Sequence, residues 1–600
     1  LLANKGKVPE KDVLEKAKKD GFSDRYLAQI LDVTEEEIRK ARTGFGITES
    51  WEPVRVSGTK DSAYYYSTYN AKDESTVTDK KKIMILGGGP NRIGQGIEFD
   101  YCCVHAAFAL KEMGFETIIV NCNPKTVSTD YDTSDKLYFE PLTLEDVLSI
   151  YEKEKPLGVI AQFGGQTPLN LAADLKKNGV NILGTSPEII DMAEDRDLFR
   201  AMMDKLQIPM PEAGMAVDVD EALAIAERIG YPVMVRPSYV LGGRGMEVVY
   251  DPENLKIYME AAEGVTPDRP ILIDRFLRHA MECEADAISD GEHAYVPAVM
   301  EHIELAGVHS GDSACIIPSR HISEENLKTI KEYTKKIAEE MHVKGLMNMQ
   351  YAIEDGVVYV LEANPRASRT VPLVSKVCAI SMVPLATEII TSEFTGKESP
   401  IKDQKDREIP YYGVKEAVFP FNMFQEVDPV LGPEMRSTGE VLGLSENVGE
   451  PFFKAQEATQ TRLPKEGNVL MSVSKKDKPE LVEVAKKFED CGFGILATGT
   501  TYELLKENGI KAERINKMQE GKPNIVDAII NGKIQLIINT PATGDEKAFD
   551  DSYIRKNAIK AKIPYMTTMA AAKATADGIY TVIHEGEIGV KSLQEIHELI

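Results

Sequence analysis

The chain has 600 residues, which at about 150 residues per domain corresponds to about four domains. Hydrophobic residues make up 43% of it and charged residues 28%, a composition that excludes a mainly disordered or fibrous protein. Its 70 basic and 96 acidic residues give a net charge of −26, so we expect no nucleic acid and no membrane among its partners.

The cysteines and the first residues bear on the cellular compartment. The chain has 7 cysteines, an odd number without a C-x-x-C pair, which argues against a disulfide framework and against a zinc site. We therefore expect a reducing, cytoplasmic location. Because the chain begins Leu1-Leu2-Ala3, without a Met or an apolar signal segment, we expect it to be part of a longer chain.

Residues 1 to about 50 are predicted to form short helices. One of them should follow Thr34, because Thr34 and Glu37 have the spacing of a capping box. Residues 51 to about 80 are polar and aperiodic. We interpret their Tyr64-Tyr65-Tyr66 cluster as a packing patch against a neighbouring domain, with a ligand stack as the alternative.

From Lys82 onward, predicted strands alternate with helices. Strands are expected at 83–86, 117–120 and 158–161, with an Ala-rich helix at about 101–113. This order indicates a parallel sheet with helices on both faces and a site at the carboxyl ends of the strands. The glycine-rich turn 87–96 matches neither G-x-G-x-x-G nor a P-loop, so it fits a tight turn and a nucleotide loop equally well.

Residues from about 199 to 391 read as an α+β region with long helices among strand pairs. A helix is predicted from an N-cap at Ser323 to about Met341. The loop 238–246 carries paired glycines and Arg244 after a predicted strand. It suits a mobile flap that closes over phosphates, with an exposed hairpin tip as the alternative.

Residues 347–366 read as a hairpin whose register can be set in two ways. A two-residue loop at Asp355-Gly356 places Gln350 opposite Leu361, whereas a three-residue loop places Tyr351 opposite Leu361. The second register gathers the apolar residues on one face, and we favour it because the hydrophobic pattern selects the register.

The favoured register has a chemical consequence. It places Gln350, Glu362 and Asn364 together on the opposite face, with Arg366 and Arg369 nearby. One carboxylate and two amide oxygens form a hard donor set that suits Mg²⁺ and a substrate phosphate. The alternative is a polar, solvated face of the sheet.

The remaining segments give weaker signals. His309 lies in a glycine-rich loop, and since no Ser-His-Asp spacing supports a nucleophile, we expect it to contact a nucleotide or to form hydrogen bonds. Residues from about 400 to 460 are punctuated by Pro and Gly. After Gly467 a small, separate α/β unit is predicted, with strands at 469–473 and 493–497 and a helix at about 479–489.

Together, the segments 87–103, 236–249, 300–314, 362–376 and 431–441 resemble the large subunit of carbamoyl-phosphate synthase, an ATP-grasp family. The resemblance covers essentially the whole chain. The family's large subunit has two homologous halves, and since each motif occurs once here, the chain resembles the carboxyl-terminal half.

The fold class implied by the resemblance is a multidomain protein of α/β and α+β units. Its expected parts are the tail of a helical oligomerisation domain at 1–78, a pre-ATP-grasp domain at 79–198, an ATP-grasp domain at 199–391, the remainder of the carbamoyl-phosphate domain with a connector at 392–460, and a methylglyoxal-synthase-like allosteric domain at 461–600.

The resemblance implies that the chain is an ATP-dependent ligase that phosphorylates carbamate to carbamoyl phosphate, for pyrimidine and arginine biosynthesis. No nucleophilic side chain is required for such phosphoryl transfer. The implied ATP contacts are Arg196, Arg236, Asp274, Leu277, Glu282, Gly307, Val308, His309, Ser310, Gln350 and Glu362. The implied ligands of Mg²⁺ or Mn²⁺ are Gln350, Glu362 and Asn364, and K⁺ is a further candidate ion. The residues expected to act on the reacting groups are Arg236, Glu362, Asn364, Arg366 and Arg369.

Effectors and partners are also implied. Glu304, Asp312 and Glu416 match positions for ornithine. The positions that match a nucleoside monophosphate site are Lys478, Thr498, Thr501, Lys517 and Asn539. Hydroxyls and free amides at the helix start after Thr498 suit a phosphate, whereas Pro541 stands where a threonine is common and supplies no hydroxyl.

The implied partners are a glutaminase small subunit and the amino-terminal half of the large subunit, within an oligomer. Two alternatives stay open at this point. One is another ATP-grasp ligase that joins a carboxylate to an amine, and the other is a non-catalytic effector-binding module.

Overall fold

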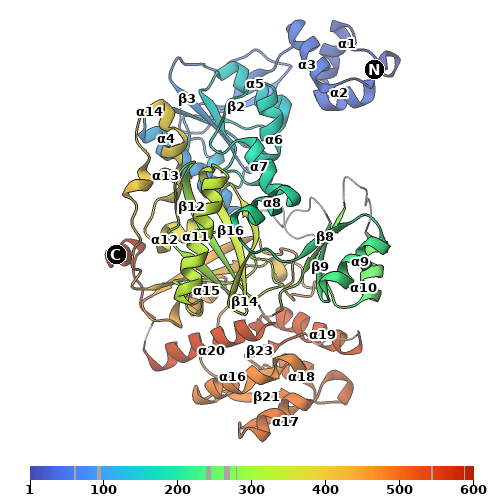
Figure 1. Ribbon diagram of the computed structural model, residues 1–600, viewed down its shortest axis with the longest axis vertical. Helices are drawn as coiled ribbons and strands as arrows, with labels where there is room; N and C mark the ends of the chain where they lie inside the picture. Colours follow the sequence, from blue (N-terminus) through green and yellow to red (C-terminus); the bar gives the residue numbers. More distant parts are fainter. Residues whose placement is uncertain are drawn as a thin grey trace.

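The computed structural model describes residues 1–59, 62–90, 96–237, 245–262, 270–278, 280–541, 545–586 and 588–600, without the side chains of 545–550. The parts follow one another along the longest axis, from the N-terminal helices to the C-terminal α/β unit (Figure 1). The last residues leave that unit and return to the middle of the molecule, where His597 Nε2 lies 2.6 Å from the carbonyl of Lys376.

Three helices form a lobe at the N-terminus, with an apolar core of their own. They are α1 (Lys11–Lys19), α2 (Asp24–Leu31) and α3 (Glu35–Gly44). The capping box predicted at Thr34 and Glu37 is confirmed, since both of its hydrogen bonds are present. Lys18 of this lobe forms buried ion pairs with Asp24 and, across the boundary to the next part, with Glu145.

Among the described residues, seven strands form the next sheet, in the order β1-β2-β5-β4-β3-β6-β7. They are β1 (Ser50–Pro53), β2 (Tyr64–Thr68), β3 (Lys82–Leu86), β4 (Glu116–Val120), β5 (Lys136–Tyr138), β6 (Gly158–Ile160) and β7 (Ile182–Leu183). The helices are α4 (Glu98–Glu112), α5 (Leu144–Glu154), α6 (Gln166–Lys177) and α7 (Pro187–Glu194). The predicted parallel sheet is confirmed, with β1–β2 as an antiparallel addition.

The aperiodic reading of residues 51–80 is wrong, because two of the seven strands lie there. Tyr65 of β2 is buried and packs with Trp51 and Tyr138, whereas Tyr66 is exposed, so the interpretation as a packing patch holds for Tyr65 but within its own sheet and not against a neighbouring domain. The sheet therefore extends across the boundary that we expected at residue 78.

A small antiparallel sheet follows, in the order β10-β9-β11-β8 within the described residues. Its strands are β8 (Ala213–Ala216), β9 (Val233–Pro237), β10 (Glu247–Val249) and β11 (Ile271–Arg275). The helices of this region are α8 (Arg196–Leu206), α9 (Val219–Ile229) and α10 (Pro252–Ala261). Residues 238–244, which hold most of the predicted flap with Arg244, lie outside the described residues.

The central sheet has eight strands in the part of the chain that the structure describes, in the order β17-β16-β12-β14-β15-β18-β19 with β13 beside β12. They are β12 (Met281–Asp290), β13 (Ala294–Tyr295), β14 (Val299–Leu305), β15 (Cys315–Ile317), β16 (Lys344–Glu354), β17 (Val357–Asn364), β18 (Tyr412–Val418) and β19 (Gly439–Ser445). The helices are α11 (Glu324–Glu340), α12 (Val371–Val377), α13 (Met382–Ile390), α14 (Ser392–Thr395) and α15 (Glu450–Ala458). Ser323 accepts a hydrogen bond from the Asn326 amide, so the predicted N-cap is confirmed. Since β18 and β19 complete this sheet, it extends past residue 391.

One apolar core joins the region of the seven-stranded sheet to the central region. It contains Cys102, Ala106 and Leu110 of α4 together with Val374 and Val383 of α12 and α13. In the described residues no single helix has the length and apolar character of a membrane span. The bent helix pair α12–α13 has the length and composition of a membrane span, but most of its residues are buried in this core.

The C-terminal unit is a five-stranded parallel sheet as far as the chain is described, in the order β22-β21-β20-β23-β24. Its strands are β20 (Asn468–Ser472), β21 (Gly494–Thr498), β22 (Ala512–Ile515), β23 (Leu536–Asn539) and β24 (Tyr565–Met566). Its helices are α16 (Lys478–Asp490), α17 (Gly499–Glu507), α18 (Ile525–Ile530), α19 (Asp545–Ala561) and α20 (Met569–His584). The terminal helix α21 (Leu593–His597) lies away from this unit, where Ile596 joins the core of α12 and α13. The predicted α/β unit is confirmed. Its helix α20 packs on α15, where Gly449 lies directly against Thr581.

Candidate active site

The hairpin β16–β17 combines both predicted registers. Asp355 and Gly356 form a two-residue turn with positive φ angles of 51° and 80°, so the favoured three-residue loop is wrong. Tyr351 faces Val360 near the turn, but beyond a bulge Gln350 faces Glu362. The extra residue is Leu361, which a bulge leaves unpaired.

This bulge preserves the chemistry that the favoured register predicted. Near the turn, Tyr351 and Val360 point into the buried core, and beyond the bulge Met349 and Ala363 do the same. The polar residues of both strands consequently share the other face. The prediction assumed two regular strands. In the structure, the extra residue Leu361 allows a two-residue turn and still keeps the apolar residues of both strands on one face.

The predicted metal ligands lie together and are held by hydrogen bonds. The Asn364 Nδ2 group donates to Glu362 Oε1 at 2.9 Å, and Arg366 Nη2 donates to Asn364 Oδ1 at 3.2 Å. Gln350 Nε2 donates to Ser310 Oγ at 3.2 Å. Burial lowers the pKa of the Arg366 guanidinium. The structure thus brings Ser310, an implied ATP contact, next to the three oxygen donors.

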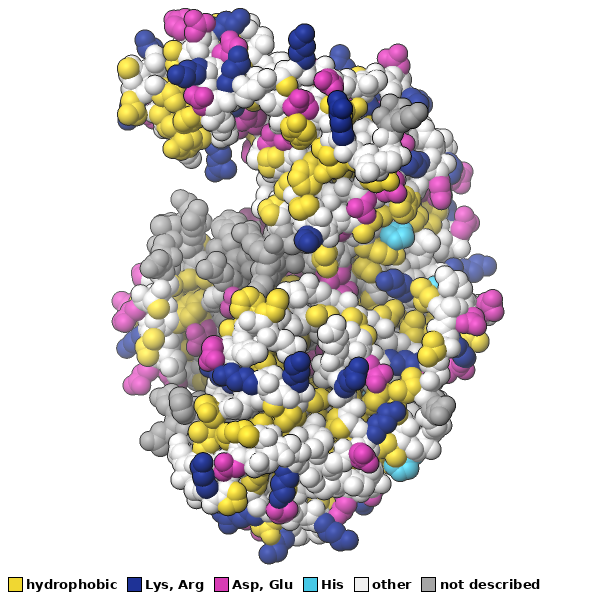
Figure 2. Space-filling model, turned by 180° about the vertical axis from the view of Figure 1, so that it is seen from behind, with side chains coloured by type: hydrophobic (Ala, Val, Ile, Leu, Met, Phe, Trp, Pro, Cys, Tyr) yellow, Lys and Arg dark blue, Asp and Glu magenta, His cyan; other side chains and the backbone are white. Residues whose placement is uncertain are grey.

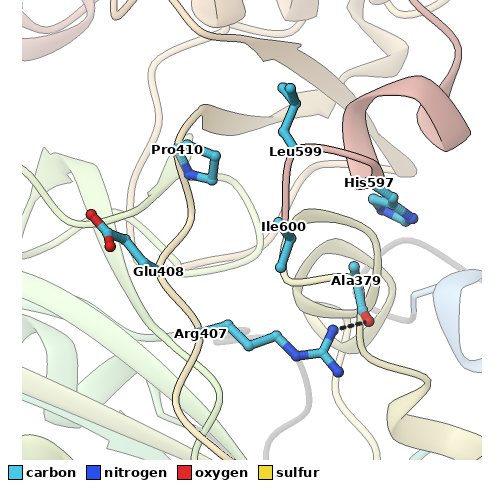
Figure 3. A pocket seen from close by; sticks show the side chains of 7 residues that line it. All are labelled: Ala379, Arg407, Glu408, Pro410, His597, Leu599 and Ile600. Atoms are coloured by element: carbon cyan, nitrogen blue, oxygen red, sulfur yellow. Dashed lines mark hydrogen bonds between the residues drawn. The ribbon is translucent and has the colours of Figure 1, made fainter.

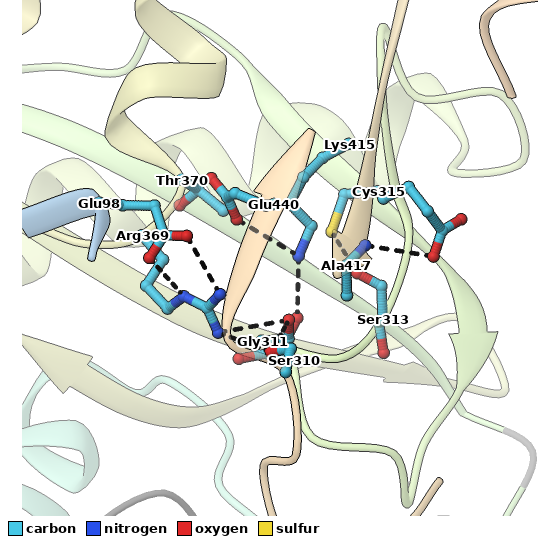
Figure 4. Close-up of polar contacts among 12 residues, drawn as sticks. Glu98, Ser310, Gly311, Ser313, Cys315, Arg369, Thr370, Lys415, Ala417 and Glu440 are labelled. Carbon is cyan, nitrogen blue, oxygen red and sulfur yellow. Dashed lines mark hydrogen bonds and ion pairs between the residues drawn. The ribbon is translucent and has the colours of Figure 1, made fainter. Parts of the chain in front are cut away.

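Arg369 connects this site to the neighbouring part of the molecule (Figure 4). Its Nε and Nη2 groups donate to the two carboxylate oxygens of Glu98 on α4, at 3.0 and 3.3 Å. Its Nη1 group donates to Ser437 Oγ at 3.1 Å. Glu98 and Ser437 lie 271 and 68 residues from Arg369, and no local sequence signal pointed to either of them.

A buried lysine lies beside the loop that carries His309 and Ser310. Lys415 of β18 donates to the carbonyl of Ser310 at 3.3 Å and forms an ion pair with Glu440 at 3.9 Å (Figure 4). Burial raises the pKa of Glu440 to about 7, against the opposing effect of Lys415. His309 lies in this loop, where its Nδ1 accepts a hydrogen bond from the Gly311 amide and burial lowers its pKa. Sequence reasoning missed Lys415 and Glu440.

The other implied ATP contacts form three groups. Asp274 of β11 pairs with Arg196 and lies 3.6 Å from Arg236 Nε, and burial lowers the pKa of Arg196. Leu277 packs with Ala352 in an apolar cluster that Tyr359 and Leu361 join. The remaining members stand at the start of β12 and in the loop after β14: Glu282, Gly307 and Val308.

The residues implied for ornithine are only partly brought together. Glu304 and Glu416 are buried neighbours, and burial with the Glu304 carboxylate raises the pKa of Glu416 to about 8. Asp312 has other partners, since its carboxylate accepts hydrogen bonds from the backbone amides of Arg436 and Ser437 at 2.8 and 2.9 Å.

The residues implied for a nucleoside monophosphate lie at the carboxyl edge of the C-terminal parallel sheet. Thr498 Oγ1 lies 2.9 Å from Ser472 Oγ, and Lys478 Nζ donates to the carbonyl of Thr500 at 3.2 Å. Lys517 lies 3.8 Å from Asp551, and Thr501 Oγ1 accepts from the Val473 amide.

Asn539, the fifth of these residues, is fully buried and engaged. Its Nδ2 group donates to the carbonyl of Ser472 at 3.1 Å and to Asp551 at 3.3 Å, while its Oδ1 accepts from Arg555 at 2.8 Å. Sequence reasoning missed Arg555, whose other contact is with Asp428, 127 residues away.

A cavity away from these residues is also present. It has a volume of about 650 Å³ and is lined by Ala379, Arg407, Glu408, Pro410, His597, Leu599 and Ile600 (Figure 3). None of the predicted site residues is among them. Within the described residues, no group of three or more His, Cys, Asp and Glu side chains is arranged to hold a metal ion.

Comparison with protein families gives four matches. Residues 2–46 match a carbamoyl-phosphate synthetase large-chain oligomerisation domain, and residues 79–192 match a carbamoyl phosphate synthase preATP-grasp domain. Residues 195–393 match the ATP-binding domain of the carbamoyl-phosphate synthase L chain. Residues 480–567 match an MGS-like domain.

Individual proteins give the same family. A carbamoyl phosphate synthase large chain from Archaeoglobus fulgidus is 52% identical over 98% of this chain, which spans 55% of that relative. A protein from Aquifex aeolicus named carbamoyl phosphate synthase large chain, C-terminal section, is 53% identical over 86% of this chain and is covered completely. Among solved structures, a biotin carboxylase–β,γ-ATP complex from Campylobacter jejuni is 15% identical, with a TM-score of 0.48 over 64% of this chain and 91% of that one.

Proposed function

Because the chain belongs to the carbamoyl-phosphate synthase large-chain family, we propose that it catalyses the ATP-dependent phosphorylation of carbamate to carbamoyl phosphate. We propose further that it corresponds to the carboxyl-terminal half of the family's large chain, since it spans about 55% of a full-length relative. The observation that carries the proposal is the shared polar face of Gln350, Glu362 and Asn364 beside Arg366 and Arg369.

The oxygen donors fit a divalent cation of the Mg²⁺ or Mn²⁺ type. One carboxylate and two amides form an incomplete shell, as expected of an ion that also binds substrate phosphate and water. Their hydrogen bonds to one another and to Arg366 fix their orientation. When bound, the ion supplies charge neutralisation on the transferred phosphoryl group. We propose K⁺ as a further bound ion.

We assign the nucleotide to the space between the small sheet and the central sheet. The buried Nε atoms of Arg196 and Arg236 have no hydrogen-bond partner among the described residues, which suits an anionic phosphate. The apolar cluster of Leu277, Tyr359 and Leu361 offers a surface for the adenine ring. Ser310 lies beside the oxygen donors, since its hydroxyl accepts a hydrogen bond from Gln350.

The transfer itself requires orientation and charge neutralisation from these side chains. In-line phosphoryl transfer needs no protein nucleophile. Arg366 and Arg369 present guanidinium groups to the anionic substrates, and Arg369 is oriented by Glu98. Lys415 adds a positive charge beside the Ser310 carbonyl.

Effector binding forms a second layer of the proposal. The pair Glu304 and Glu416 would take the ammonium groups of ornithine. The edge that carries Lys478, Thr498 and Thr501 would take the phosphate of a nucleoside monophosphate. Asn539 would contribute through its contacts with Arg555 and Asp551, because its own amide is buried and engaged.

The proposed partners follow from membership of the family and from one exposed hydrophobic surface. A glutaminase small subunit would supply ammonia, and the amino-terminal half would supply carbamate, in the cytoplasm and for pyrimidine and arginine synthesis. Hydrophobic side chains gather on the N-terminal lobe (Figure 2), where Leu2, Val13, Tyr26 and Phe45 are exposed, and this lobe would take part in oligomerisation. The domain limits 1–78, 79–198, 199–391, 392–460 and 461–600 are proposed as units of the family, with β1 and β2 added to the sheet of the second unit and β18 and β19 added to the sheet of the third.

The reverse reaction tests the function directly. The protein should form ATP from carbamoyl phosphate and MgADP, and it should release ADP from ATP when carbamate is added. ADP release with an amino acid in place of carbamate would instead indicate another ATP-grasp ligase. Effector binding without any turnover would indicate a non-catalytic module.

A further inference from the structure

The ring of Phe99 lies close to a site arginine and to a glycine. Phe99 is in the first turn of α4, and its ring centroid is 5.5 Å from the guanidinium carbon of Arg366. A Cβ added to Gly165 would lie 2.9 Å from Cδ2 of the same ring. The absence of a side chain at Gly165 thus leaves room for the ring beneath Arg366.

Contacts continue from Arg366 to the proposed metal ligands. Its Nη1 group donates to the Ala367 carbonyl at 2.9 Å, and its Nη2 group donates to Asn364 Oδ1. Asn364 in turn donates to Glu362. A displacement of the Arg366 guanidinium would therefore disturb the orientation of both side chains.

An aromatic ring is a suitable partner for an arginine that must bind an anion. The face of a ring attracts a guanidinium but occupies none of its five N–H donors. Among the described residues, the Arg366 side chain donates two hydrogen bonds, to the Ala367 carbonyl and to Asn364 Oδ1, both close to it in the chain. The preceding residue, Glu98, forms a two-pronged ion pair with Arg369 instead. Consecutive residues of α4 thus hold the two arginines by different interactions.

We propose that Phe99 is a positioning residue that holds Arg366, and through it Asn364 and Glu362, in the orientation required for phosphoryl transfer. This inference rests on the proposed function. It assigns a role in the site to a residue of the neighbouring sheet region, and it explains Gly165 as the space that the ring requires.

The kinetic test uses Phe99→Leu, Phe99→Tyr and a matched control in the intact chain. The control is Phe139→Leu, because Phe139 is also a half-buried phenylalanine of this region, with its ring 5.9 Å from that of Tyr64. In ATP formation from carbamoyl phosphate and MgADP, Phe99→Leu should lower kcat about 5- to 30-fold, the effect of losing a desolvated cation–π contact. Its KM for MgADP should stay within about 2-fold, since no nucleotide contact is removed.

Rescue separates positioning from packing. Phe99→Tyr keeps the ring and should retain kcat, while Phe139→Leu should change Tm as much as Phe99→Leu without the loss of kcat. Equal kinetics of the two leucine variants would overturn the proposal. If Phe99→Leu does not fold, Phe99→Met fills the space without a ring face and is subject to the same outcomes.

A spectroscopic readout makes the inference independent of turnover. In ¹⁵N-arginine-labelled protein, the Nε–H resonance of Arg366, assigned by its loss in Arg366→Lys, should carry a ring-current shift that disappears in Phe99→Leu. An unchanged resonance would overturn the positioning contact. A wild type that makes no ATP but shows the expected shift would instead contradict the proposed function alone.

Discussion

Arg555 and Asp428 form a two-pronged ion pair that joins the C-terminal unit to the central region. The Nε and Nη2 groups of Arg555 lie 2.8 and 2.7 Å from the two carboxylate oxygens of Asp428. Arg555 also donates to Asn539, and the carbonyl of Asp428 accepts from Arg436 Nη1 at 2.6 Å. Since the Arg436 amide donates to Asp312, hydrogen bonds run from the proposed effector edge to the loop of His309.

We predict that Arg555→Gln weakens the communication between these sites. A nucleoside monophosphate that changes the KM for MgADP in the wild type should change it by less than about half as much in the variant, because the charged link to Asp428 is lost. Steady-state kinetics with and without uridine or inosine monophosphate measure this ratio. Lys560→Gln is the control, since Lys560 pairs with Glu426 across the same two regions on the surface. An unchanged ratio in Arg555→Gln would contradict the prediction.

Glu362→Gln should remove Mg²⁺-dependent phosphoryl transfer while the fold stays intact. Loss of the only carboxylate in the proposed ligand set should cost on the order of 3–4 kcal/mol of transition-state stabilisation, by analogy with loss of one preorganised donor. This corresponds to a decrease of about 10²- to 10³-fold in ATP formation. Glu354→Gln, at the other end of the same hairpin, should have little effect, because Glu354 pairs with Arg275 instead. A wild-type rate in Glu362→Gln would refute the ligand assignment.

The pH dependence of stability should report on Glu416. Its pKa in the folded protein is raised from 4.5 to about 8 by burial and by Glu304. Between these values the folded state holds a proton that the unfolded chain has lost, so the free energy of unfolding decreases as pH rises through this window.

Glu416→Gln cannot lose a proton and should flatten that profile. Above about pH 8 the variant should be more stable than the wild type, by on the order of 1–3 kcal/mol. Tm measured from about pH 5 to about pH 9 tests this, with Glu393→Gln, an exposed carboxylate of α14, as the control. If Tm of the wild type and of Glu416→Gln changes with pH in the same way, the buried carboxyl does not contribute to the pH dependence of stability.

Nucleotide binding to the C-terminal unit can be measured without turnover. Uridine and inosine monophosphates should give saturable heats with the whole chain, and Lys478→Met should weaken binding about 5-fold or more, because Lys478 lies beside the helix start at Thr500. Lys475→Met removes an exposed lysine from the preceding turn and should bind normally. No heat for either nucleotide at millimolar concentration would refute the site.

Local patterns predicted much of the fold. The caps at Thr34 and Ser323 and the alternating strands after Lys82 depend on neighbouring residues, and all were confirmed. Residues 51–68 were not predicted as strands. The edge strand β1 pairs with β2, and β2 pairs with β5, about 70 residues further along the chain, so strands this short have little local pattern to reveal them.

The sequence predicted the oxygen donors of the candidate site but not the residues that hold the site in place. Gln350, Glu362 and Asn364 lie on one hairpin, so a pattern of period two could find them. Their loop was mispredicted because a bulge at Leu361 has no distinct sequence signature. Glu98, Phe99 and Lys415 reach the site from other elements, and only the tertiary fold brings them there.

The completion of the central sheet by β18 and β19 restricts where this chain can be divided. A fragment that ended near residue 391 would keep every proposed oxygen donor but would leave the backbone of β15 unpaired along the edge that Lys415 and its neighbours normally cover. Unpaired, flat strand edges recruit other chains and lead to aggregation. Fragments for expression or crystallisation should therefore extend beyond Ser445, and a shorter one that precipitates would reveal an exposed strand edge rather than a defective active site.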